Sequence, residues 1–289
     1  MRPQAKPHMT GLLPLDQAIF ETIVGRYVEQ VSARLGLNSS ANAPVAIAKL
    51  PFQVRSPGYL RHTKLSAVAL LVRPATSRPR SDLPSARAVE EIQQDLEIEL
   101  ELSTLGLTTM RHTSYILHRT RGQYWIDVMG FPKHIVPETD EQRAILDTLL
   151  ADRPRRQFRY PNVQVGYRPG VSRPLLIDFG GIDLIDRDGW DWLLRAHSCA
   201  FEIFQLPTDD FAPFLSRGHD IARALAAALD AERDRLLTAL SSLGAVADFD
   251  ACSRLEELAI LIARLAECDA PVDGYINSCV DRMVRTIAS

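Results

Sequence analysis

The chain has few cysteines and no long apolar run, and both features limit what it can be. None of its four cysteines forms a C-x-x-C pair, so a zinc ribbon is not indicated. No stretch of about 18 uncharged apolar residues occurs, as a membrane-spanning helix would need. The N-terminus also lacks the apolar segment of a secretory signal. We therefore expect a cytoplasmic protein without membrane contact, whose thiols are buried and reduced.

Several catalytic motifs are also missing. The 289 residues contain no G-x-S-x-G elbow, no G-x-x-x-x-G-K-[ST] loop and no H-E-x-x-H pair. Serine-hydrolase, P-loop and zinc-protease chemistry therefore have no support. The seven histidines are scattered, and we predict no metal site. Apolar residues make up 46% and charged residues 24% of the chain, which is typical of a globular protein with a hydrophobic core.

Charge is distributed unevenly along the chain. Residues 1–174 hold 23 Lys+Arg and 16 Asp+Glu, a net of +7, and residues 175–289 hold 10 and 20, a net of −10, which together give the overall −3. This asymmetry indicates that the N-terminal part meets something anionic or that the two parts attract each other.

Helical periodicity dominates both ends of the chain. Apolar residues from Ile19 to Leu35 recur at helical spacing, with Asp16 as the predicted N-cap and Gly36 as the predicted end. Beyond residue 207 the pattern is wholly helical. It predicts three helices, marked by apolar residues over 221–243, 255–265 and 272–287.

Strand patterns lie between these helices. Residues 65–73 predict a buried strand, whereas the prolines of 44–60 leave room only for short extended pieces. Asp95–Leu102 alternates acidic and apolar residues, which favours a strand, although a helix over 84–105 also fits. The remaining predictions are strands over 113–119 and 123–131 joined by a turn at Arg121-Gly122, a helix over 139–150, an Arg-rich loop over 153–173, a strand over 175–179, a helix over 188–199 and a strand over 201–206.

These elements predict an α/β fold with a mixed sheet, an N-terminal helix and a C-terminal all-helical bundle. The predicted divisions are an N-terminal helix and linker over 1–60, a mixed α/β core over 61–207 and a helical bundle over 208–289.

The most informative segment is Pro174–Ala200, in which an apolar strand ends at Asp178 and an acidic loop opens a helix. Its I-D-F-G-G-I-D-L-I-D-R-D-G frame resembles the centre of a STAS domain, the fold of anti-sigma-factor antagonists, over about residues 120–217. The resemblance implies a non-enzymatic, regulatory protein-binding module that acts in a larger assembly. The serine that accepts phosphate in that family is replaced by Arg187, so the resemblance does not carry over the phosphorylation switch. The switch-loop equivalents are Asp186, Arg187, Asp188 and Gly189.

The same region also resembles a degenerate protein kinase. Arg155–Asn162 has the spacing of the H-R-D-x-x-x-x-N loop, and Asp178-Phe179-Gly180 reads as D-F-G. Asn162 and Asp178 match the family's magnesium-holding positions. Gln157 replaces the catalytic base and no glycine-rich loop exists, so this resemblance implies binding of ATP and magnesium without catalysis. The D-x-D-G of Asp186–Gly189 further resembles haloacid-dehalogenase-type phosphatases, in which the first Asp attacks phosphate.

A third interpretation comes from the Arg-rich segment, which has six arginines and no acid over 153–173. Arginines pair with phosphates and aromatic rings stack on bases, so the segment predicts a nucleic-acid-binding subunit. The other interpretation is a solvated loop whose charges meet the acidic C-terminal bundle or the acidic face of Glu97, Glu99 and Glu101. The sequence leaves the ligand, the partner and the oligomeric state open. The candidate anion-binding residues are Arg153, Arg155, Arg156, Phe158, Arg159, Tyr160 and Arg168.

Overall fold

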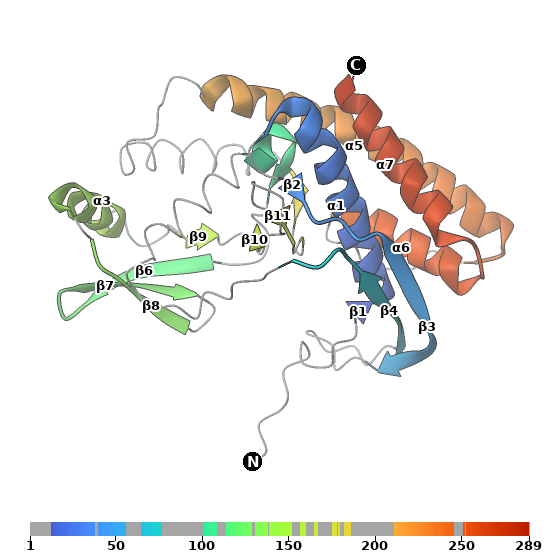
Figure 1. The fold of residues 1–289 in the computed structure, drawn as a ribbon, viewed down its shortest axis with the longest axis horizontal. Helices are drawn as coiled ribbons and strands as arrows, with labels where there is room; N and C mark the ends of the chain where they lie inside the picture. Colours follow the sequence, from blue (N-terminus) through green and yellow to red (C-terminus); the bar gives the residue numbers. More distant parts are fainter. Residues whose placement is uncertain are drawn as a thin grey trace, which may run out of the picture.

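A computed structural model of the chain describes residues 13–37, 40–55, 65–76, 101–108, 114–128, 131–137, 139–151, 157–159, 165–166, 175–177, 179, 182–185, 211–245, 251 and 253–288. Figure 1 shows the arrangement. The helices with defined bounds are α1 (Leu15–Leu35), α3 (Asp140–Ala151), α5 (Phe211–Ser242), α6 (Arg254–Glu267) and α7 (Val272–Ala288).

The strands are short and fall into four small sheets. Their bounds are β1 (Leu13–Pro14), β2 (Ser40–Ala41), β3 (Ala46–Arg55), β4 (Leu65–Val72), β5 (Leu107–Thr108), β6 (Ser114–Thr120), β7 (Gln123–Val128), β8 (Phe131–Ile135), β9 (Gln157–Arg159), β10 (Val165–Gly166), β11 (Leu175–Leu176) and β12 (Asp183–Leu184). The sheet orders are β1-β4-β3, β10-β11-β2, β12-β5 and β8-β7-β6-β9. The predicted mixture of helix and sheet with C-terminal helices is thus confirmed at this level.

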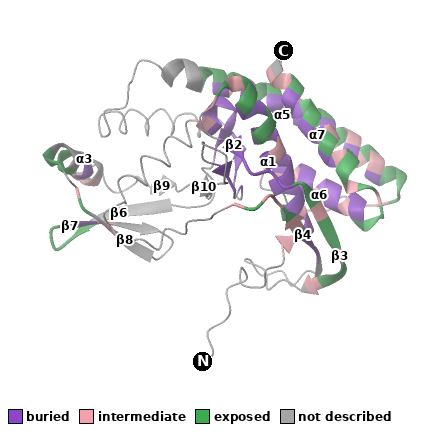
Figure 2. Cartoon of the chain, in the orientation of Figure 1, coloured by how far each residue is buried: buried purple, intermediate pink, exposed green. Residues whose placement is uncertain are grey.

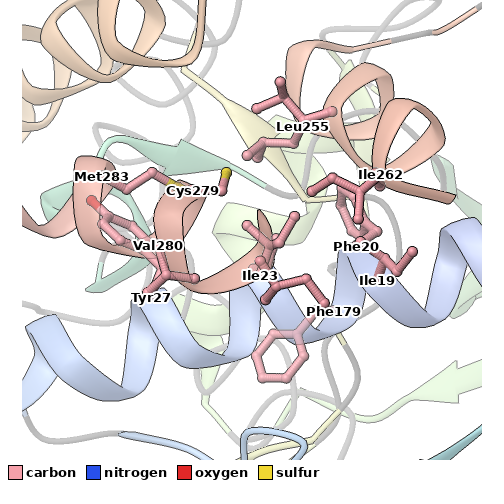
Figure 3. Close-up of a cluster of buried hydrophobic side chains, with 14 of the residues drawn as sticks. Ile19, Phe20, Ile23, Tyr27, Phe179, Leu255, Ile262, Cys279, Val280 and Met283 are labelled. Atoms are coloured by element: carbon pink, nitrogen blue, oxygen red, sulfur yellow. The ribbon is translucent and has the colours of Figure 1, made fainter. Parts of the chain in front are cut away.

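Helix α1 lies at the centre of the hydrophobic core. It contacts α6 and α7 on one side and strands β1, β3 and β4 on another. Figure 3 shows its side chains among those of α6 and α7, with Phe179 on the opposite side of the helix. Tyr27 is fully buried and its hydroxyl donates to the Leu105 carbonyl at 2.8 Å. Burial raises the pKa of the Tyr27 phenol, so the hydroxyl stays protonated and remains a donor.

The ends of α1 agree only partly with the sequence prediction. Gly36 ends the helix as predicted, in the left-handed conformation with φ 66°, and its N–H donates to the Ser32 carbonyl. The prediction of Asp16 as N-cap is wrong, because Pro14 holds that position and Asp16 lies in the first turn. Helix α1 begins at Leu15 because β1 pairs with β4 and Leu15 is buried in the core. These contacts outweigh the preference of a carboxylate for the N-cap position.

The three C-terminal helices are confirmed, and α6 begins at a serine cap, where the Ser253 hydroxyl accepts from the Glu256 N–H. Cys279 of α7 is buried as predicted, and burial raises the pKa of its thiol, which keeps it protonated. The prediction of burial is wrong for Cys268, which lies exposed just after α6. No helix among the described residues has both the length and the apolar character needed to cross a bilayer.

Two strand predictions for the first half of the chain are corrected. Residues 44–60 hold one ten-residue strand, β3, instead of short pieces. Pro51 fits because the register with β4 shifts between Lys49 and Gln53, and a proline is tolerated at such a bulge on an edge strand. The favoured strand over Asp95–Leu102 is wrong at its described end, since residues 101–104 are helical. Leu102 is buried in the core there, which helical spacing allows.

The middle of the chain is a sheet and a helix that pack together. The predicted hairpin is confirmed, with β6 and β7 joined by Arg121 and Gly122 at φ 53° and 77°. Helix α3 is confirmed over most of its predicted length. The Arg-rich segment is not all loop, because β9 adds to the free edge of β6 and β10 pairs with β11. The strand predicted over 175–179 is limited to β11, and the elements predicted over 188–199 and 201–206 lie outside the described residues.

One continuous core draws on all three predicted divisions of the chain. It includes α1, Ala67 and Ala69 of β4, and the inward faces of α5, α6 and α7. The end of the helical segment 101–104 packs against α5, where Gly106 has φ 74° and would place a Cβ within 3.0 Å of Ala222 backbone atoms.

The close approach of the Ser103 carbonyl to Gly218 predicts that one added methyl group destabilises the fold. A Cβ at Gly218 would lie 1.8 Å from the Ser103 carbonyl oxygen, whereas a Cβ at Gly274 of α7 meets nothing within 4 Å. Gly218→Ala should therefore lower the free energy of unfolding by about 2 kcal/mol or more. Gly274→Ala should raise it by about 0.5–1 kcal/mol. Urea unfolding measures both, and equal stability of the two variants would contradict the packing described.

The ion pair between Glu21 and Arg73 generates a second prediction. Arg73 also donates to the Ile177 carbonyl and lies 6.0 Å from the centre of the Phe179 ring. Glu21 is buried, so Glu21→Ala should leave a mostly buried guanidinium without its carboxylate and cost about 3–5 kcal/mol.

The matched control is Asp220→Ala, which removes an ion pair to Arg223 whose two side chains are exposed. This control should change the free energy of unfolding by less than about 1 kcal/mol. Equal losses in the two variants, measured by urea unfolding, would show that the Glu21 pair is as solvated as a surface pair.

Candidate functional site

The sheet β1-β4-β3 has one face on the core and one face directed away from it. Ala67 and Ala69 of β4 belong to the core, and Ile47 and Leu71 pack against it. These residues share odd numbers, as strand alternation requires for one face. The even-numbered residues of β4 and of the regularly paired start of β3, Ala46 and Ala48, therefore lie on the opposite face of the sheet. Phe52 belongs to the irregular stretch of β3 between Lys49 and Gln53.

That opposite face is apolar and exposed in part, whereas Val68 of β4 on the same side is only 4% exposed. We name it the outer face and define it by five residues, of which Phe52, Leu70 and Val72 are 49%, 46% and 48% exposed. The register places Ala46 beside Val72 and Ala48 beside Leu70, and both alanines are exposed. Figure 2 shows the exposure of β3 along most of its length. The outer face comprises Ala46, Ala48, Phe52, Leu70 and Val72.

Large apolar side chains concentrate at this place in the molecule. Six such side chains are exposed among the described residues, and three of them lie on the outer face. A fourth, Val45, lies directly before β3 and its N–H donates to the Val72 carbonyl at 2.8 Å. An antiparallel sheet that faces water normally carries polar residues on that side. A contiguous group of exposed apolar side chains often marks a binding site, whereas apolar residues exposed singly are common on protein surfaces.

The outer face is held in place by contacts to three helices. Arg26 of α1 donates to the Pro44 and Val45 carbonyls at 3.3 and 3.2 Å and to Asn277 of α7 at 2.7 Å. Lys49 of β3 donates to the Ala266 carbonyl of α6 at 2.6 Å. The strand that carries half of the face is therefore fixed to the helical core at both its start and its middle.

The edge of the same sheet is less suited to binding than its face. Strand β3 is the last in its sheet among the described residues. Its register shifts around Pro51, which has no N–H to donate, and Lys49 adds a charge next to the shift. Bulges, prolines and lysines on an edge strand hinder pairing with a further strand. A partner would thus gain more by covering the apolar face than by extending the sheet.

The four-stranded sheet β8-β7-β6-β9 is a second candidate surface. Helix α3 attaches to it at Asp147, which accepts from the Tyr124 hydroxyl at 2.8 Å and from Arg119 at 3.1 Å. Tyr124 is buried there. Loss of solvation is the larger cause that raises the pKa of its phenol, and the hydrogen bond to Asp147 is the second. Trp125 lies on the other face by alternation, is half-buried, and contacts His134 with ring centres 4.9 Å apart.

Strand β9 brings part of the predicted anion site to this sheet. The register pairs Arg159 with Ser114 and Phe158 with Tyr115. The sheet order makes β9 an outermost strand, next to β6. The sequence-predicted residues that lie outside the described part of the chain are Arg153, Arg155, Arg156, Tyr160, Asn162, Arg168, Asp178, Asp186, Arg187, Asp188 and Gly189.

The outer face was missed by the sequence prediction. The run LSAVALLV of β4 is apolar at nearly every position, which predicts a strand buried on both faces. This prediction is wrong for Leu70 and Val72, which are 46% and 48% exposed, and correct for Val68 on the same side, which is buried. The described residues also contain no group of three or more side chains arranged to hold a metal ion.

Comparison of the chain with protein-family models, with curated proteins and with solved structures gives no significant match. The case for a function therefore depends on the two surfaces described above.

Proposed function

We propose that the chain is a protein-binding module that docks a partner on its outer face. The observation that carries the proposal is the exposure of Leu70 and Val72 on one side of a sheet whose other side packs on the core, with Phe52 also exposed on the neighbouring strand. Burial of apolar area contributes about 25 cal/mol per Å² to association. A partner that covers these side chains therefore gains free energy without rearrangement of the core.

The proposal agrees with the protein-binding role that the STAS resemblance implies, but it uses other residues. The resemblance concerns about residues 120–217, whereas the outer face lies within 46–72. No hydroxyl switch is needed for binding of this kind, because the apolar side chains are constantly exposed. We propose no catalytic step at this surface.

The double variant Leu70→Ser with Val72→Thr tests the proposed function. Both side chains are about half exposed, so the stability should change by less than about 0.5 kcal/mol for each. Proteins that co-purify with the full-length chain from its source cells are quantified by mass spectrometry. The double variant should lose at least one partner that the wild type retains in stoichiometric amount.

The matched control replaces exposed apolar side chains elsewhere, through Val136→Thr and Leu243→Ser, which are 45% and 51% exposed. This control should keep the partner. Loss of the partner in both variants would point to general surface hydrophobicity, and its retention in both would refute docking on the outer face.

Binding of single-stranded nucleic acid is a second candidate function, at the four-stranded sheet. The observation that favours it is the position of Arg159 in β9, in the same sheet as the half-exposed pair Trp125 and His134. A cation and an accessible aromatic ring in one sheet could meet a phosphate and a stacked base of the same oligonucleotide. The alternative is that the Arg-rich segment pairs with acidic residues of the same chain and binds no nucleic acid.

Trp125→Ala and Arg159→Glu test this second function by fluorescence anisotropy with a labelled oligonucleotide. Loss of one stacked base should weaken binding by about 1–3 kcal/mol, and loss of one phosphate contact should reduce the salt slope by about one. Phe52→Ala, which removes an exposed ring from the other sheet, should leave binding unchanged. Absence of salt-sensitive binding by the wild type would reject this function.

A further inference from the structure

Three charged side chains meet where helices α5 and α7 lie side by side (Figure 1). Glu232 of α5 is fully buried, and its Oε1 accepts hydrogen bonds from Nε of Arg235 at 3.0 Å and from Nη2 of the same side chain. Its Oε2 lies 2.6 Å from Nε of Arg282 of α7. One buried carboxylate therefore holds two guanidiniums from two helices. We name Arg235 and Arg282 the arginine pair.

Helix α7 places a ring and a neutral thiol beside the arginine pair. Tyr275, Cys279 and Arg282 are spaced i, i+4 and i+7, so they lie on one side of the helix. The centre of the Tyr275 ring lies 5.3 Å from Cζ of Arg235. Burial, and then the charge of Glu232, raise the pKa of the Cys279 thiol, which stays protonated. The two arginines and the one glutamate thus give a net charge of +1, two minus one.

This excess of positive charge distinguishes the cluster from other ion pairs of the bundle. In those pairs each arginine has at least one carboxylate of its own, for example Arg233 with Glu257 and Arg254 with Asp230. The arginine pair instead shares Glu232. One arginine would be enough to neutralise that carboxylate, so the second positive charge is available to an anion from outside the chain.

Most hydrogen-bond donors of the arginine pair are unused. A guanidinium carries five N–H groups, and Arg235 uses those of Nε and Nη2 on Glu232. Although Nε of Arg282 is close to Oε2 of Glu232, this oxygen receives no hydrogen bond within the part of the chain that the structure describes. The side chains of Arg235 and Arg282 are 38% and 43% exposed. A ligand can therefore approach both guanidiniums and accept from them.

A phosphate group matches both the unused donors and the net charge. Arginine binds phosphate oxygens through two parallel hydrogen bonds. A phosphate monoester carries about −1.5 to −2 charges at neutral pH and three acceptor oxygens, so it can accept from both arginines at once. A carboxylate has a single charge and two oxygens. Because Glu232 already holds the two guanidiniums together, less freedom is lost when the ligand binds.

The charge of the surrounding sequence favours a small phosphate compound over a nucleic acid. Residues 175–289 have a net charge of −10, and charge of the same sign repels a long polyanion. A nucleic acid also follows an extended positive groove along its backbone, whereas the arginine pair is a single point on the surface of the bundle. A ligand with one phosphate group fits this setting better.

We infer that the arginine pair binds a single phosphate group of a small compound at the contact of α5 and α7. The phosphate oxygens accept from N–H groups of Arg235 and Arg282, and Glu232 is the positioning residue that holds both guanidiniums. The site lies on other elements than the outer face and the four-stranded sheet, so it is independent of the proposed function.

Titration calorimetry of the full-length chain with inorganic phosphate, in chloride buffer of matched ionic strength, tests the site. Phosphate should bind and should raise the temperature of thermal unfolding, because it binds only the folded state. Acetate should bind at least about tenfold more weakly, since it offers one charge and two oxygens. A single-stranded oligonucleotide should not displace phosphate.

Conservative variants assign the binding to the arginine pair. Arg235→Lys and Arg282→Lys keep a positive charge beside Glu232 but remove the guanidinium fork, so each should weaken phosphate binding about tenfold. The matched control is Arg285→Lys, which changes an exposed arginine of the same helix that donates to the Asp281 carbonyl. This control should bind phosphate as the wild type does. Urea unfolding in chloride checks that all three variants are folded.

A measurement on the wild type needs no variant. The Nε–H resonances of Arg235 and Arg282 should shift when phosphate is added, and that of Arg285 should stay in place. Unmoved resonances of the arginine pair would overturn the inference even if the lysine variants did not fold. Absence of phosphate binding by the wild type, acetate binding of equal strength, displacement by the oligonucleotide, or equal weakening in Arg285→Lys would each overturn it as well.

Discussion

Burial of α1 on nearly all its sides is the constraint on which the other elements depend. Thirteen of its 21 residues are buried, among them Glu21, Thr22 and Ser32. A helix that is buried all round must find neighbours in several directions, and α1 finds α6 and α7 on one side and the sheet β1-β4-β3 on another. Two of the polar groups that enter the core with it have partners, whereas the Ser32 hydroxyl has none among the described residues. The Thr22 hydroxyl donates to Ala18 and Glu21 pairs with Arg73.

The candidate docking face is a consequence of this arrangement. Because α1 occupies the inner side of a narrow sheet, Leu70 and Val72 on the other side of β4 stay about half exposed, although Val68 on that side is buried. Arg26 and Lys49 fix the same strand to α1, α7 and α6. The face is thus presented on a rigid support, which lowers the entropic cost of binding a partner.

The charge of the chain distinguishes the two candidate surfaces from the C-terminal helices. Both lie in the part of the sequence with net positive charge, residues 1–174, whereas α5, α6 and α7 belong to the acidic remainder. The described ion pairs of these three helices are made within the bundle, for example Arg233 with Glu257 and Arg254 with Asp230. The acidic part therefore supplies its own counter-charges in these pairs, and the basic part is the one suited to an anionic partner.

The sequence by itself determined the position of those helices and turns that depend on a few adjacent residues. The spacing from Ile19 to Leu35 with Gly36 after it defined α1, and Arg121-Gly122 defined the hairpin, because a left-handed cap and a two-residue turn depend on a few adjacent residues. Tertiary structure alone decided which side of β4 faces the core. An apolar run such as LSAVALLV fits burial on one face or on both, and the choice depends on which helices exist to cover each side. For the same reason the pairing of β9 with β6 and the burial of Leu102 in a helical turn were decided by distant neighbours, beyond the reach of local pattern.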